Sequence, residues 1–196
     1  MSSDNTNCKE IFEEIKSFSI ERISELIKQV LEKTEQTCVD IGKDLDSEFD
    51  EKVEADLTLD YLRQNKEEIG HQFLKQSSET LAGEKIVGES NQDLSLTLSL
   101  VDDDTLDEMI LIGEIAGKIQ DHYEHHLKAL KRGLVRLGKN LDFEPEPEAF
   151  SPKKLALLLS ESLKESELSL SNKKRFYNAF RDIAKVELET FYGGLL

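Results

Sequence analysis

The sequence predicts an all-α protein, a helical bundle of about six helices. Apolar side chains recur at intervals of three, four and seven residues over most of the chain, which is the spacing of amphipathic helices. Hydrophobic residues make up 38% of the sequence and charged residues 34%, with no Trp. This composition is typical of a helical protein with a large solvated surface. With 196 residues, the chain is long enough to bury a substantial core.

The first region, from about Lys9 to Glu54, is predicted to be helical throughout. Gly42 is its only helix breaker, and a single glycine costs a helix about 1 kcal/mol without ending it. The pattern therefore allows one very long helix or two helices joined near Gly42, and we favour a long antiparallel hairpin. The apolar stripe runs through Ile11, Ile15, Phe18, Ile20, Ile23, Ile27, Val30, Thr34, Cys38, Ile41, Leu45 and Phe49.

A further helix is predicted from Thr58 to Leu81, with Gly83 as its stop. Its apolar face carries Leu59, Leu62, Ile69 and Phe73. Residues 83–93 contain two glycines, a serine and an asparagine, so we expect a loop there. This loop divides the chain into an N-terminal long-helix region, residues 1–83, and a C-terminal helical region, residues 94–196.

The segment from Leu94 to Leu100 alternates leucine with serine or threonine, which is the period of a half-buried strand. No second segment has the same pattern. The segment either lies extended over the helices, which we favour, or pairs with a second copy of the chain.

The segment from Asp102 to Gly138 is predicted to form one very long central helix, about 34 residues and about 50 Å long. Acidic residues gather at its start and basic residues at its end, as the helix dipole favours. Asp104 or Thr105 can cap the first turn and Gly138 can close the last. One row of its seven-residue repeat consists of Met109, Ala116, Tyr123, Leu130 and Leu137, and a second row of Ile112, Ile119, Leu127 and Leu134.

The C-terminal part should contain two more helices. Residues 140–151 form a proline-interrupted loop, after which Ser151 caps a helix with Pro152 at its first position. The last helix is predicted from Lys173 onward, with a cap at Gly193-Gly194. The predicted core positions are Leu155, Leu158, Leu159 and Leu163 in the first helix, and Phe176, Phe180, Ile183, either Val186 or Leu188, and Phe191 in the second.

Charge and cysteine content exclude several classes of function. The formal net charge is −16, which repels phosphate backbones and argues against general nucleic-acid binding. Cys8 and Cys38 stand far apart and form neither a disulfide framework nor a zinc motif, which indicates a reducing cytoplasm. The sequence has neither a secretion signal nor an apolar run long enough to insert in a membrane.

The histidines of the central helix are the only candidates for a metal site. His122 and His126 are four residues apart and share a helix face, with His125 beside them. The order His-Tyr-Glu-His-His differs from the zinc-protease motif, which has glutamate directly after the first histidine. We therefore expect a solvated helix face and assign no catalytic, cofactor-binding or metal-binding residue. A metal-dependent helical enzyme or sensor on the His122/His126 face is the alternative.

Three other charged motifs have structural explanations. Asp102-Asp103-Asp104 lacks the glycine of phosphotransferases of the haloacid-dehalogenase type and fits helix capping. Arg132 and Arg136 match half of the signature by which PilZ domains bind cyclic di-GMP, but the other half is absent from the sequence. Lys173-Lys174-Arg175 starts a helix with basic charge, against the dipole preference, and is either a solvated face or a contact surface.

Several segments resemble the bacterial domain-of-unknown-function family 1631, whose members often carry a thymidine phosphorylase label. They are Arg63 to Leu74, Leu98-Ser-Leu-Val-Asp-Asp-Asp104, Leu127 to Leu130 and Phe150-Ser-Pro152, within roughly Tyr61 to Leu196. Many longer members end in a PilZ domain, which this chain lacks. The resemblance implies a helical module of bacterial signalling or regulation, linked to cyclic di-GMP pathways without binding the nucleotide itself, and it supplies no catalytic residue.

The sequence thus predicts a non-enzymatic interaction or scaffold module. Its partners would be proteins, with a homo-oligomer through Leu94–Leu100 or through the tail from Phe191 to Leu196 as one possibility. We expect no cofactor, no nucleic-acid partner and no membrane insertion.

Overall fold

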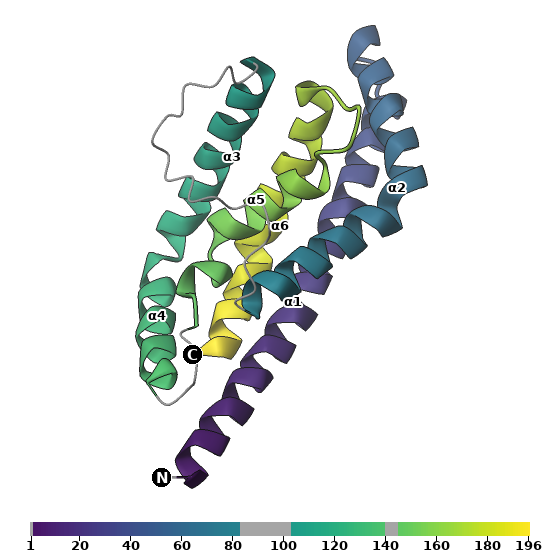
Figure 1. Cartoon of the computed structure of the whole chain (residues 1–196). Helices are drawn as coiled ribbons and strands as arrows, with labels where there is room; N and C mark the ends of the chain where they lie inside the picture. Colours follow the sequence, from purple (N-terminus) through teal and green to yellow (C-terminus); the bar gives the residue numbers. More distant parts are fainter. Residues whose placement is uncertain (1, 83–102, 140–144) are drawn as a thin grey trace.

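The computed structural model describes residues 2–82, 103–139 and 145–196, and it confirms the all-α fold class. Figure 1 shows the arrangement, in which α5 and α6 lie between the α1–α2 pair and the α3–α4 pair. Within the described residues the elements are α1 (Ser2–Lys43), α2 (Phe49–Leu81), α3 (Asp103–His122), α4 (Glu124–Gly138), the 3-10 helix η1 (Pro147–Phe150), α5 (Pro152–Ser162) and α6 (Leu170–Leu195). The Leu94–Leu100 segment and the loop at 83–93 lie outside them.

The two N-terminal helices form the expected antiparallel hairpin (Figure 1). The chain turns just after Gly42, where Asp44 accepts a hydrogen bond from the Asp46 backbone N–H at 3.0 Å and one from the Ser47 hydroxyl at 3.2 Å. An aspartate that bonds the backbone two residues later offers the chain an alternative to helix and favours a turn. Helix therefore stops for residues 44–48, and α2 begins at Phe49 and not at Thr58.

Because of this turn, the prediction is wrong for the last two residues of the apolar stripe, Leu45 and Phe49. Ile23, Ile27, Val30 and Cys38 are buried as predicted, whereas Leu45 and Phe49 are exposed. The prediction assumed one uninterrupted helix. Once α1 ends, residues spaced by three or four no longer lie on the same helix face.

The predicted central helix is interrupted at Tyr123, which separates α3 from α4. Tyr123 has φ −101° and ψ 12°, outside the helical region, and its N–H contacts the carbonyl oxygens of both Ile119 and Gln120. Its ring is fully buried, and its hydroxyl donates to the backbone carbonyl of Lys185 in α6 at 2.7 Å. We attribute the interruption to this anchoring, which a seven-residue repeat does not reveal. Met109, the first residue of the repeat, is also exposed.

The C-terminal part agrees closely with its local sequence signals. Ser151 caps α5, its hydroxyl accepting from the Lys154 backbone N–H at 3.1 Å, with Pro152 in the first turn. The loop before it contains η1. Ser169 caps α6, so this helix begins three residues before the predicted Lys173. Of the two alternatives at the inner face of α6, Leu188 is buried and Val186 is exposed.

The predicted glycine cap at the end of α6 is wrong. The helix runs through Gly193 and Gly194 to Leu195. A Cβ atom at Gly194 would overlap the ring of Phe18 in α1, whereas a Cβ at Gly193 would meet nothing within 4 Å. Gly194 therefore serves the close approach of α6 to α1.

One hydrophobic core joins all six α-helices. Its buried members include Val30 of α1, Phe73 of α2, Ile119 of α3, Leu134 of α4, Leu159 of α5 and Phe180 of α6. A smaller buried cluster of Cys38, Ala55 and Leu59 lies between α1 and α2. Described residues of both predicted regions, 1–83 and 94–196, contribute to the shared core, and the division into two regions stays a prediction.

Candidate functional site

The three neighbouring histidines lie around the interruption at Tyr123. His122 ends α3, and His125 and His126 belong to the first turn of α4. The ring centroids of His122 and His126 lie 4.8 and 5.8 Å from that of Tyr123. His122 and His125 are exposed, while His126 is half-buried. The Nδ1 atom of His126 is buried and has no hydrogen-bond partner among the described residues.

The carboxylates beside these histidines do not complete a metal site. Glu124 forms an ion pair with Lys128 at 2.7 Å, and this hydrogen bond lowers the pKa of Glu124. Across the part of the chain that the structure describes, no three His, Cys, Asp or Glu side chains come together in a geometry that could hold a metal ion. His126 instead stacks on Tyr192, with the ring centroids 6.2 Å apart.

The basic start of α6 bonds to other helices and is neither a plain solvated face nor an open contact surface. Lys173 donates to Glu108 of α3 at 3.0 Å, and Arg175 lies 3.7 Å from Glu54 of α2. The side chains of Lys173 and Arg175 are mostly buried, whereas Lys174 between them is exposed. The charges that oppose the helix dipole are compensated by acids of two neighbouring helices.

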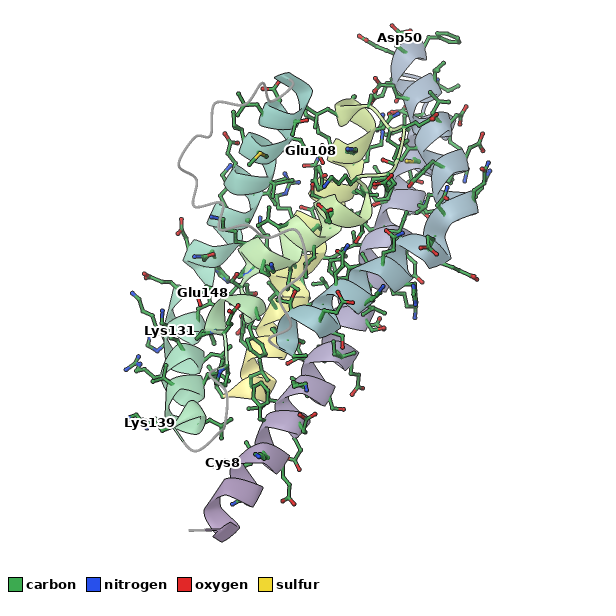
Figure 2. All side chains as sticks on the ribbon, in the orientation of Figure 1. Cys8, Asp50, Glu108, Lys131, Lys139 and Glu148 are labelled. Carbon is green, nitrogen blue, oxygen red and sulfur yellow. The ribbon has the colours of Figure 1, made fainter. Side chains whose placement is uncertain are left out.

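Glu108 is the centre of a mostly buried polar cluster. Figure 2 labels it between α3 and the start of α6. Its Oε1 accepts from the hydroxyls of Ser160, at 3.0 Å, and Tyr177, and its Oε2 accepts from Lys173. The pKa of Tyr177 is raised, mainly by burial and secondly by the hydrogen bond to Glu108. The phenol therefore stays protonated and donates its hydrogen bond. Because both carboxylate oxygens already accept bonds, we interpret this cluster as a connection between α3, α5 and α6.

A second polar cluster connects α1 to α6. Glu187 accepts from Arg22 at 2.6 Å and from Gln29 at 3.1 Å. The same carboxylate borders an open hollow between the two helices. The Glu187 side chain is 15% exposed and its ionic partner lies in hydrogen-bond contact, so this cluster too stabilises helix packing.

Exposed apolar side chains gather at two places. One is the α3 surface, formed near the start of α3 by Leu106, Met109 and Ile110, each of them more than 40% exposed. The other is the tip surface, at the end of the α1–α2 hairpin, formed by Leu45, Phe49, Val53 and Leu57. Adjacent exposed apolar side chains are a common feature of protein contact sites.

A family model described as "Protein of unknown function (DUF1631) N-terminal domain" matches residues 8–195. The chain belongs to this family. The match confirms the resemblance found over roughly Tyr61 to Leu196 and extends it toward the N-terminus, over residues 8–60. No curated protein and no solved structure matches it. None of its helices within the described residues combines the length and apolarity that crossing a membrane requires.

Sequence reasoning missed the interior role of Glu108, Lys173 and Arg175 in this family member. An acid near the start of α3 fitted the helix dipole, which hid its interior role. The only signal was the unfavourable basic start of α6. A charge placed against the dipole is a reason to look for an acidic partner from a distant part of the chain.

Proposed function

We propose that this chain is a non-enzymatic helical interaction module that binds protein partners in the bacterial cytoplasm, in signalling or regulation. Apolar exposure on the α3 surface is the observation that carries the proposal. Leu106, Met109 and Ile110 are exposed on a helix that already packs on α5 and α6. Burying such side chains against a partner yields roughly 25 cal/mol per Å² of apolar surface.

The use of the interior polar groups also supports a binding role. Glu108 and Glu187 hold helices together, and their oxygens accept bonds from this chain's own side chains. Two unpaired cysteines suit a reducing compartment. The net charge of −16 disfavours phosphate-rich ligands.

The link to cyclic di-GMP pathways rests on the family resemblance alone. Longer members often end in a PilZ domain, and such a domain would bind the nucleotide while this module binds a protein. The chain itself should then give no heat of binding with cyclic di-GMP in calorimetry.

The proposal is tested by chemical cross-linking in cells of the source bacterium, followed by mass spectrometry. Leu106→Ser/Ile110→Ser should lose cross-links that the wild-type chain forms, because it removes apolar contact area from α3. Val186→Ser is the matched control, since Val186 is an exposed apolar residue on α6. Equal cross-linking by all three proteins would argue against the α3 surface. Solution mass at several concentrations decides whether a second copy is among the partners.

The competing metal hypothesis has its own test. Thermal unfolding is followed for the metal-free protein with zinc, manganese, iron(II), calcium and common nucleotides, cyclic di-GMP included. A rise in the unfolding temperature with one metal, lost in His122→Ala/His126→Ala, would replace the proposal with a metal-dependent function. An unfolding temperature that stays the same with every metal and nucleotide would support the proposed interaction function.

A further inference from the structure

The tip surface combines exposed apolar residues with strong negative charge. Phe49, Val53 and Leu57 follow one another at intervals of four, so they lie on one face of α2. Phe49 is 78% exposed, and Leu45 in the preceding turn is 92% exposed. The opposite face of the same helix is buried through Ala55, Leu59 and Leu62. This end of α2 therefore has an apolar face beyond what the fold itself uses.

The charges around this face are mostly acidic. From Lys43 to Asp60 the sequence has eight acidic and two basic residues, a net charge of −6. Asp50, Asp56 and Asp60 are exposed residues of α2 in this region. The tip thus carries more than a third of the net charge of −16 in under a tenth of the chain.

This chemistry selects one kind of partner. We propose that the tip surface binds a basic amphipathic helix of another protein, with the apolar side of that helix on Phe49, Val53 and Leu57. Apolar anchors rimmed by acids complement a helix that has lysines or arginines beside an apolar stripe. This inference rests on the proposed function and specifies the partner for one of the two surfaces.

Charge also argues against the other occupants. Two tip surfaces facing each other would bring together two net charges of −6, which repel. Anionic lipid and nucleic acid are disfavoured for the same reason. Helix α4 of a second copy is basic, with Lys128, Lys131, Arg132 and Arg136. Its exposed side, however, offers Val135 as its only large apolar residue, against four at the tip.

The two charged regions lie at opposite ends of the molecule. In the view of Figure 2, Asp50 marks the hairpin tip at the upper right, while Lys131 of α4 and Lys139, directly after α4, lie at the lower left. A contact between α4 of one copy and the tip of another would therefore run head to tail and generate chains of molecules, not a closed dimer. Solution mass can detect this outcome.

The test uses the full chain and a synthetic amphipathic helix of leucine and lysine carrying a fluorophore. Fluorescence anisotropy should show saturable binding that weakens as salt rises. A scrambled peptide of the same composition, which has the charge without the apolar face, should bind at least about tenfold more weakly. A leucine–glutamate helix should not bind.

Two variants locate the site. Phe49→Ser/Leu57→Ser should weaken binding at least about tenfold, because it removes the apolar anchors. Asp50→Lys/Asp56→Lys should weaken it to a similar extent and abolish most of the salt dependence. Val186→Ser and the α3 variant Leu106→Ser/Ile110→Ser are controls that should bind as the wild-type chain does. Circular dichroism verifies that each variant is folded.

Equal binding of the scrambled peptide, or undiminished binding by Phe49→Ser/Leu57→Ser, would overturn the inference. So would a concentration-dependent solution mass that Phe49→Ser/Leu57→Ser lowers, since the occupant would then be a second copy. The cross-linking experiment on the α3 surface is independent of these results. If the α3 variant loses cross-links and the peptide does not bind at the tip, the chain is still an interaction module. The tip surface is then not one of its binding sites.

Discussion

Lys173 of α6 and Glu108 of α3 form an ion pair across 3.0 Å with side chains only 13% and 14% exposed. They are 65 residues apart in the sequence. Glu108→Ala should lower the free energy of unfolding by about 3 kcal/mol, because it leaves Lys173 charged and unpaired in a mostly buried position. Urea unfolding followed by circular dichroism measures this loss.

The control for this prediction is another pair with the same distance. Lys164 and Glu161 also lie 3.0 Å apart, but both are more than half exposed. Glu161→Ala should therefore change the free energy of unfolding by no more than about 0.5 kcal/mol. Similar losses in Glu108→Ala and Glu161→Ala would contradict the interior role of Glu108.

The contact between Gly194 and Phe18 predicts opposite effects for two neighbouring substitutions. Gly193→Ala should stabilise the protein by about 0.5–1 kcal/mol, since a helical alanine replaces glycine with open space around its Cβ. Gly194→Ala brings the same propensity gain, but its methyl group overlaps the Phe18 ring at a cost of about 1–3 kcal/mol. Thermal unfolding should rank Gly193→Ala above wild type and Gly194→Ala below it. The reverse order would refute the close approach.

The two thiols should differ in reactivity. Cys38 is 1% exposed, and burial raises its pKa, with Asp56 acting in the same direction and Arg175 against it. Cys8 is half-buried. A disulfide reagent at neutral pH should modify Cys8 quickly and Cys38 only in denaturant. Cys8→Ser should abolish the fast phase and Cys38→Ser should leave it; fast modification of Cys8→Ser would contradict the burial of Cys38.

Alkaline pH should unfold the protein and ionise its tyrosines together. Burial raises the pKa of all four, Tyr61, Tyr123, Tyr177 and Tyr192, above the usual value of 10.0. A folded-state pKa above the unfolded one contributes stability that is fully present below pH of about 10 and lost as pH rises further. Tyrosinate absorbance should therefore appear with the loss of helical circular dichroism. Ionisation of all four in a protein that stays helical would contradict this.

The sequence by itself determined the fold class and most local features. Ser151 and Pro152 start α5 because a cap and a first-turn proline act within a few residues. The buried residues Leu59, Leu62, Ile69 and Phe73 of α2 were predictable because one helix face repeats along the chain. The family, too, was recognisable from short segments, and the model match over residues 8–195 confirms it.

Only the tertiary structure decided what depends on distant parts of the chain. It separated α3 from α4 at Tyr123, whose hydroxyl bonds to Lys185, 62 residues away. It turned the basic start of α6 into two interhelical ion pairs and left Phe49 exposed at the hairpin tip. Periodicity and capping result from neighbours along the chain, so sequence reveals them. Partners across helices are fixed by how the helices pack, and the burial that packing imposes decides which charges are paired inside and which apolar residues remain at the surface.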